Sequence, residues 1–239
     1  MVSFLRKLRH NLIPKTALGK YFFYALGEIV LVVVGILIAL SINNWNEERQ
    51  QKQKVDGMFV ILKDDIENDL KDAAQVLEYY RGYEDEFVSL MKGTMSFEEF
   101  RDCPQCAYLV TGHRSFNIEL RGYESLKRFY STHDEDTLVN QIVQRYTSSL
   151  NNIDSNDDLI RESIAADLVI WRNQYDWFTQ FALAEDHTAY AEYATSSKEF
   201  RNMTAWRYAL IYANYVPAVE TFEANLKDIL TNIEKRLSQ

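Results

Sequence analysis

The stretch that decides the fold is Tyr21–Ile42, YFFYALGEIVLVVVGILIALSI, which is apolar over almost its whole length. At a rise of 1.5 Å per residue, a helix of this length spans about 33 Å, and the hydrocarbon core of a bilayer is about 30 Å thick. Aromatic residues stand at both ends, at 21–24 and at Trp45, where amphipathic rings favour the headgroup layer. These features predict a transmembrane helix over residues 21–45.

A cleaved signal peptide is the competing interpretation of this stretch. Ile29–Leu40 has the length of a signal-peptide core, and Ala39-Leu40-Ser41 resembles a cleavage site. The aromatic block before Glu28 lengthens the apolar span beyond such a core, which favours a retained membrane helix.

The charge of the chain changes sign across the predicted membrane helix. The residues up to Leu26 include five basic side chains and no acidic one. The whole chain has 26 basic and 35 acidic residues, so the remainder has 21 basic and 35 acidic residues, a net charge of −14. Because basic flanks stay on the cytoplasmic side, residues 1–20 are expected to form a cytoplasmic, basic amphipathic tail on the inner leaflet. The residues after the helix are expected on the far side of the bilayer.

Glycine and proline are scarce beyond the membrane stretch. The chain has eight glycines and three prolines, and no glycine follows Gly122. Since β and α/β folds rely on these residues for turns, their scarcity favours long helices. We therefore predict an all-α protein: an N-terminal transmembrane helix, a polar helical stalk at residues 46–54, and an up-and-down helical bundle at residues 55–239.

Apolar periodicity places the helices of this domain. Apolar residues at 3-4 spacing begin at Val55 and continue to Tyr80, which predicts one long helix that ends near Gly93. Its apolar face is expected to pack against later helices of the same chain, with an intersubunit coiled coil as the alternative. Ser96 and Glu99 have the spacing of a capping box. Further helices are expected at residues 118–130, 136–150, 156–184 and 204–237, the last kinked near Tyr215 by Pro217.

Three residues of the membrane stretch are candidates for a helix contact or a polar site. A carboxylate at Glu28 is costly in hydrocarbon, so it indicates an interfacial position, a protonated side chain or a polar contact. Gly35 and Ala39 form a small-xxx-small pair, which allows two membrane helices to approach closely.

Cys103 and Cys106 are the two cysteines of the chain, and a disulfide between them is expected in an oxidising compartment. The sequence CPQC also has the form of a glutaredoxin-type redox motif, but the preceding MSFEEFRD does not supply the buried strand that such a motif needs. With His113 and His133 the cysteines would form a Cys₂His₂ zinc set, at a spacing unlike that of common zinc fingers. No metal and no cofactor is therefore predicted.

Aromatic residues are concentrated in two of the predicted helices. Those at positions 171, 175, 178 and 181 share one face, and those at 208, 212 and 215 share another. This spacing predicts that the two helices pack together through their aromatic rows. Trp177 and Trp206 lie off the rows. The candidates for a ligand pocket or a partner surface are Trp171, Trp177, Trp206 and Tyr212.

The sequence from Tyr24 to Arg49, YALGEIVLVVVGILIALSINNWNEER, resembles the N-terminal signature of an uncharacterised family of membrane proteins abundant in Bacteroidetes. A looser similarity continues through GYESLK at Gly122–Lys127, so the resemblance is expected to cover the whole chain. It implies a bacterial inner membrane with the N-terminus in the cytoplasm and the helical domain in the periplasm. The family supplies no activity.

In such a bacterium, Asp136-Thr137-Leu138 fits the Asp-Ser/Thr-apolar pattern of periplasmic O-glycosylation, which makes Thr137 a candidate site. The alternative is that Asp136 caps the start of a helix.

The composition disfavours nucleic acid as a partner, and the sequence contains no Ser-His-Asp order, HExxH motif or P-loop. The chain is therefore predicted to be a non-enzymatic interaction or scaffold protein, either an accessory subunit of an inner-membrane assembly or a homo-oligomer. Its expected partners are the lipid bilayer and a protein, which is another chain or a second copy of itself. A helical-bundle ligand-sensing domain that signals across the membrane is the alternative, which a pocket between Trp171 and Trp206 would favour.

Overall fold

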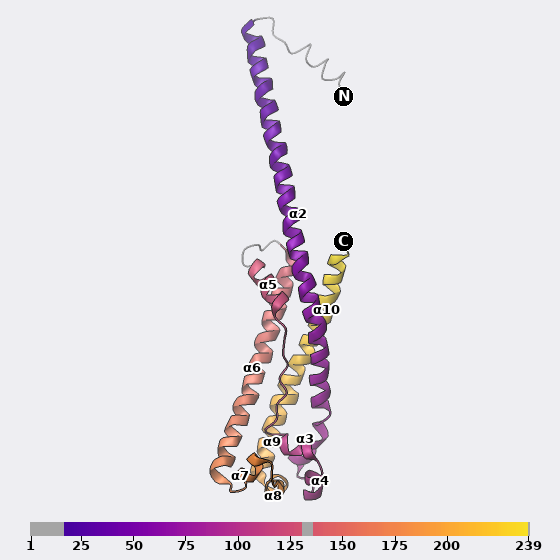
Figure 1. The fold of residues 1–239 in the computed structure, drawn as a ribbon, viewed down its shortest axis with the longest axis vertical. Coiled ribbons are helices and arrows are strands. Elements are labelled where there is room, and N and C mark those ends of the chain that lie inside the picture. Colours follow the sequence, from indigo (N-terminus) through magenta and orange to yellow (C-terminus); the bar gives the residue numbers. More distant parts are fainter. Residues whose placement is uncertain (1–16, 131–135, 239) are drawn as a thin grey trace. The chain divides into compact units, whose positions relative to one another are not determined.

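The computed structural model describes residues 17–130 and 136–238, and every regular element in these residues is a helix (Figure 1). The chain divides into two compact units, Met1–Asp56 and Gly57–Gln239. The elements in chain order are α2 (Ala17–Arg81), α3 (Glu84–Lys92), α4 (Phe97–Arg101), the 3₁₀ helix η1 (Pro104–Tyr108), α5 (Arg121–Tyr130), α6 (Thr137–Gln174), α7 (Phe178–Leu183), α8 (Thr188–Ser196), α9 (Lys198–Leu210), the π-helix η2 (Ile211–Tyr215) and α10 (Val216–Leu237).

The described part of the first unit is the N-terminal portion of α2. Its large apolar side chains between Leu26 and Ile42 are all 46–75% exposed. An 18-residue window here has a mean hydropathy of 2.7, and none of it is buried. The helix is thus long and apolar enough to cross a membrane. The tail expected at residues 1–20 lies largely outside the described residues, and so do the side chains of Phe23 and Tyr24.

The second unit is organised around the later part of α2. The apolar side chains predicted to form its inner face, from Phe59 to Tyr80, are at most 3% exposed. Salt bridges join Lys63 to Glu234 and Arg81 to Glu220, so α10 runs antiparallel to α2. The expectation that this face packs within the chain is therefore confirmed by the structure.

The helix α6 also runs antiparallel to α10. Arg145 pairs with Asp228, and Asn225 donates a hydrogen bond to Ser149. Since α10 is antiparallel to both partners, α2 and α6 run in the same direction. The chain returns between them along an extended segment, residues 113–120, which precedes α5. The sequence predicted no such segment, and residues 118–120 were expected to begin a helix; the hydrogen bonds of the segment are made to side chains of α2, α6 and η2, which are distant in the sequence.

Several predicted helix boundaries are wrong. The helix from Val55 ends at Arg81 rather than near Gly93, and α3 follows after a break at Gly82 and Tyr83. The helices expected at 136–150 and 156–184 are one helix, α6, that ends at Gln174. Asparagine and serine at positions 151–156 favour an interruption, but Ile153 and Ile160 are buried, so packing outweighs intrinsic helix propensity.

The C-terminal helices begin earlier than predicted. The structure forms α8 and α9 where a single start near Thr204 was expected. The predicted irregularity near Tyr215 is present as the π-helical turn Ile211–Tyr215, directly before Pro217. Proline has no N–H to donate into the preceding turn, and a wider turn accommodates that loss. The capping box is also confirmed: the Ser96 side chain accepts from the Glu99 N–H, and the Glu99 carboxylate accepts from the Ser96 N–H.

Candidate functional site

Three aspartates of α2 hold the extended return segment, and we call them the aspartate ladder: Asp65, Asp69 and Asp72. Each accepts a hydrogen bond from a backbone N–H of the segment or of the start of α5. The donors are Gly122 to Asp65 at 2.7 Å, Glu119 to Asp69 at 2.9 Å, and Asn117 to Asp72 at 3.1 Å. The ladder thus gives an extended segment the hydrogen bonds that a neighbouring strand would otherwise supply.

Gly122 lies at the closest approach of α5 to α2. A Cβ built on this residue would lie 2.4 Å from the Cα of Leu62 and 2.5 Å from its backbone nitrogen. Any larger residue would force the two helices apart. Arg121 adds a salt bridge from its guanidinium to Asp65 at 2.6 Å. The glycine of the GYESLK sequence is therefore explained by packing against α2, whereas its tyrosine, Tyr123, stacks on Tyr146 of α6.

Asp69 is the ladder residue whose environment is least satisfied. Its side chain is 1% exposed, and its Oδ2 has no hydrogen-bond partner among the residues that the structure describes. The nearby Tyr146 hydroxyl is buried and, within the same residues, also lacks a partner. Burial raises the pKa of Asp69 to about 7, although the bond from the Glu119 N–H opposes the shift. The carboxyl is therefore largely protonated in mildly acidic solution.

A second buried polar group, the His113 relay, joins α2 to α6 through the return segment. The Tyr80 hydroxyl lies 2.8 Å from His113 Nδ1, and His113 Nε2 lies 2.6 Å from Asp157 Oδ1. Since Asp157 accepts, Nε2 carries a proton, and the Tyr80 hydroxyl lies within hydrogen-bond distance of both His113 Nδ1 and the Arg114 carbonyl oxygen, the latter at 3.1 Å. The Arg114 N–H in turn donates to Tyr80 at 2.9 Å.

Burial lowers the pKa of His113, and the hydrogen bond to Asp157 opposes this shift. The pKa of Asp157 is lowered: burial raises it, but hydrogen bonds from His113, Ser115 and Arg161 outweigh that effect. A carboxylate, an imidazole and a hydroxyl in a row are the groups of a catalytic triad. Here, however, Tyr80 is 2% exposed and the His113 side chain 5%, so the hydroxyl points into the core rather than towards a substrate. The arrangement fixes the return segment between two helices.

Arg207 of α9 is a fully buried cation with incomplete partners. Its Nη2 donates to Ser163 at 3.1 Å and to Asp167 at 3.3 Å, both on α6, while Nε and Nη1 have no hydrogen-bond partner in residues 17–130 and 136–238. Burial lowers the pKa of Arg207 and raises that of Asp167, and their mutual attraction opposes both shifts. The pair ties α9 to α6 directly beside the surface residue Trp206.

The two predicted aromatic rows form separate clusters rather than one interface. Trp171 is fully buried, and the rings within 6.2 Å of it belong to Trp177, Phe181, Tyr190, Tyr193 and Phe200. The 208–215 row instead packs on α2 and α3: Tyr212 lies 6.4 Å from Tyr80 and 5.6 Å from Phe87. The expected packing of the two rows on each other is wrong, because α8, which was not predicted, covers Trp171.

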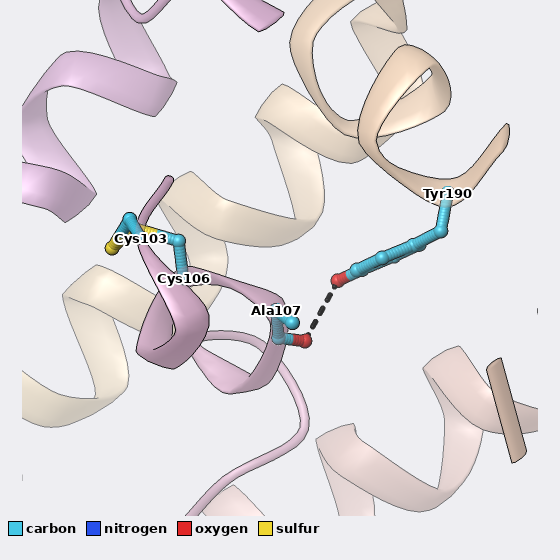
Figure 2. The surroundings of a disulfide bond; sticks show 4 residues. All are labelled: Cys103, Cys106, Ala107 and Tyr190. Carbon is cyan, nitrogen blue, oxygen red and sulfur yellow. Dashed lines mark hydrogen bonds between the residues drawn. A yellow bond between two sulfur atoms is a disulfide. The ribbon is translucent and has the colours of Figure 1, made fainter. Parts of the chain in front are cut away.

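Cys103 and Cys106 form a disulfide at the start of η1, with their Cα atoms 5.3 Å apart. Figure 2 shows that the adjacent Ala107 carbonyl accepts the hydroxyl of Tyr190, at 3.1 Å. The disulfide loop is therefore joined to the Trp171 cluster. In the part of the chain that the structure describes, no set of three or more metal-ligating side chains is present; His133 of the considered zinc set lies outside those residues.

The remaining candidates are on the surface. Glu28, Gly35 and Ala39 are exposed on α2, and no described residue lies within 4 Å of a Cβ placed on Gly35. Trp206 is 57% exposed, whereas Trp177 packs against Trp171. A pocket between Trp171 and Trp206 was considered from the sequence, but one side chain is in the core and the other faces solvent.

Thr137 is exposed at the first position of α6. Asp136 caps this helix by accepting from the N–H groups of Leu138 and Val139. The structure thus gives Asp136 the alternative role of a cap, and it leaves Thr137 an exposed residue.

A shallow depression of about 350 Å³ lies where α2 ends. One face of α2 forms its floor, and the return segment supplies one wall. Its lining residues are Gln75, Glu78, Tyr79, Gly82, Tyr83 and Arg114.

Residues 28–112 match a family of unknown function, DUF6090. The match spans the exposed apolar part of α2, the aspartate ladder and the disulfide loop, and it ends before Gly122. It supports the expected similarity to an uncharacterised family over this range, and not over the whole chain. No curated protein and no solved structure is significantly similar to the chain.

Sequence reasoning missed the aspartate ladder and the His113 relay. Asp65 and Asp69 do carry a signal, because they lie within the 3-4 spaced row that contains Leu62 and Ile66, where an acidic side chain must find a buried partner. His113 and Asp157 are 44 residues apart and have no local pattern that connects them.

Proposed function

We propose that the protein is a non-enzymatic, single-pass membrane protein whose helical domain binds another protein or a second copy of itself. The membrane part of the proposal is supported by the apolar side chains of α2, which are exposed from Leu26 to Ile42. In water such a surface is strongly unfavourable, and a bilayer is the medium that covers it without a partner helix.

The proposed orientation places the N-terminus in the cytoplasm of a bacterium and the domain in the periplasm. Its support is the charge asymmetry, since basic flanks remain inside and the remainder of the chain has a net charge of −14. The Cys103–Cys106 disulfide is consistent with an oxidising compartment. In this proposal the domain is an up-and-down arrangement in which the extended segment takes the place of one returning helix.

The single observation that carries the binding role is the exposure of Trp206. Tryptophan is the residue most enriched among side chains that dominate binding energy at protein interfaces. The neighbouring Arg207 is fully buried and bonded to Ser163 and Asp167, so the helix that presents the indole is held firmly on α6. A rigidly presented aromatic side chain loses little conformational entropy when a partner covers it.

The polar clusters in the core support a structural rather than a catalytic domain. The His113 relay bonds to the return segment with Tyr80 and the His113 side chain buried, and two of the three ladder aspartates, Asp65 and Asp69, are also buried. Such groups position secondary structure without access to a substrate.

The test is site-specific photocrosslinking of the full chain in native membranes. A photoreactive phenylalanine analogue replaces Trp206, and in a control variant it replaces the exposed Lys71 on α2. We expect a discrete adduct from position 206 and none from position 71, with mass spectrometry identifying the partner or a second copy. Equal labelling from both positions, or no adduct from position 206, would contradict the proposal.

The ligand-sensing alternative is favoured by one observation, the depression beside Tyr79 and Tyr83. A binding site there would act on the end of α2, the helix that also contains the apolar stretch.

A further inference from the structure

The depression at the end of α2 combines an aromatic floor with two opposite charges. The rings of Tyr79 and Tyr83 meet edge to face, with centroids 4.7 Å apart. Arg114 lies over Tyr79, with its Cζ 6.0 Å from the ring centroid. Its Nη2 donates to Gln75 at 2.9 Å, and the other guanidinium donors have no hydrogen-bond partner in the part of the chain that the structure describes, so they can bond a ligand.

The charged wall of the depression is held in place by the core. The Arg114 N–H donates to Tyr80, and the Arg114 carbonyl accepts from Tyr215 at 3.3 Å. These bonds fix the backbone of Arg114 between α2 and η2. The guanidinium therefore projects from an ordered support, which reduces the entropy lost on binding.

Glu78 supplies a negative charge to the lining. Within residues 17–130 and 136–238, no side chain pairs with its carboxylate. A carboxylate and a guanidinium that both face one small depression suit a ligand that carries both charges.

Gly82 leaves room between these groups. Among the residues that the structure describes, a Cβ on Gly82 would meet only the backbone oxygens of Glu78 and Tyr79 in the last turn of α2, at 3.4 and 3.5 Å, which is ordinary contact. Its φ is not in the left-handed region, so the backbone does not require glycine. The lack of a side chain at Gly82 therefore leaves space in the depression and is not needed for the backbone conformation of the turn.

We propose that this depression binds a free α-amino acid with an apolar or aromatic side chain. The carboxylate pairs with Arg114 through a charge-assisted, forked hydrogen bond, and the ammonium group pairs with Glu78. The ligand side chain lies on the rings of Tyr79 and Tyr83. A volume of about 350 Å³ is at the small end of the range for ligand pockets, which fits a single amino acid.

The experiment is isothermal titration of the full chain in detergent micelles with three probes: L-phenylalanine, 3-phenylpropionate and 2-phenylethylamine. The second probe lacks the ammonium group and the third lacks the carboxylate. We expect L-phenylalanine to bind at least about tenfold more tightly than either analogue, because each loses one charge-assisted bond. Equal affinity for all three probes, or no binding of L-phenylalanine, would overturn the proposal.

Variants assign the two charged contacts. Arg114→Gln is expected to weaken the binding of L-phenylalanine and 3-phenylpropionate about tenfold and to leave the binding of 2-phenylethylamine unchanged. Glu78→Gln is expected to weaken the binding of 2-phenylethylamine and to leave that of 3-phenylpropionate unchanged. Arg101→Gln is the matched control, since Arg101 also lies over a ring, that of Phe97, and bonds an acidic neighbour, Asp102. An equal loss in the Arg114 and Arg101 variants would show a general charge effect and refute the site.

A third pair of variants tests the space itself. Gly82→Leu is expected to abolish binding of all three probes, whereas Gly82→Ala is expected to retain L-phenylalanine binding within about threefold, since its Cβ meets only ordinary contacts. Circular dichroism and thermal unfolding show whether each variant is folded. Retained binding in a folded Gly82→Leu variant would place the ligand elsewhere.

Discussion

At the scale of single residues, the effect of a residue on the stability of this domain depends on the atoms that it contacts. Gly122 and Gly57 are both helical glycines, but only Gly122 faces another backbone. Asp65 and Asp69 are both buried on α2, but only Asp69 has an oxygen without a partner. The residue type alone does not separate the members of either pair.

Replacing Gly122 by alanine is expected to lower the free energy of unfolding by about 1–3 kcal/mol, because the new Cβ would overlap the backbone of Leu62. Gly57→Ala is the control, since nothing lies within 4 Å of its Cβ position, and it should raise stability by roughly 0.5–1 kcal/mol. Denaturant unfolding of the detergent-solubilised chain, followed by circular dichroism, measures both. Similar effects at the two positions would show that α5 does not press on α2.

Asp69 predicts a pH dependence of stability. Its pKa is about 7 in the folded chain and near 4 in the unfolded chain, so the folded state binds more protons between these values. The contribution of the Asp69 carboxyl to the free energy of unfolding is therefore fully present below about pH 4 and is lost as the pH rises towards 7.

Asp69→Asn mimics the protonated carboxyl at every pH. The free energy of unfolding of this variant minus that of the native chain should be about 2–3 kcal/mol higher at pH 8 than at pH 5, so the variant gains relative stability as the pH rises. Asp64→Asn, at an exposed position on α2, is the control. Unfolding at the two pH values measures the difference, and a pH-independent offset for Asp69→Asn would contradict the assignment.

At the scale of elements, the domain is bound together by connections that are not helices. Backbone N–H groups of the return segment and of the start of α5 donate hydrogen bonds to the aspartate ladder, and the His113 relay links the segment to both α2 and α6. The 3₁₀ helix η1, closed by the disulfide, begins this connection.

Removal of the disulfide by replacing Cys103 and Cys106 with serine is expected to reduce stability by about 2 kcal/mol, because the closed loop is only a few residues long. The helix content should not change. Thermal unfolding with and without a reductant gives the measurement: reductant should destabilise the native chain and leave the double variant unaffected. Loss of the far-ultraviolet helix signal in the double variant would mean that the loop organises the whole domain.

At the scale of the whole molecule, the chain consists of a unit that exposes apolar side chains and a unit that buries them. The described part of Met1–Asp56 has no core of its own. Gly57–Gln239 contains the aromatic clusters, the buried ion pairs and the long antiparallel contacts of α10.

Removing residues 1–56 is accordingly expected to convert a membrane-bound chain into a soluble, helical domain. The full chain should sediment with membranes and resist extraction at high pH, whereas residues 57–239 should remain in the supernatant with a cooperative unfolding transition. A full chain that is extracted at high pH would argue against membrane insertion.

The sequence by itself determined the helical class, the apolar stretch, the inner face of α2, the capping box and the interruption before Pro217. Each of these follows from composition or from spacing within a few residues, where local geometry links residue type to structure. Only the tertiary structure decided that the chain returns along an extended segment, that α6 is continuous, and that His113 meets Asp157. These depend on residues tens of positions apart, whose contact is set by how the helices pack, and packing outweighed the local propensities at positions 151–156.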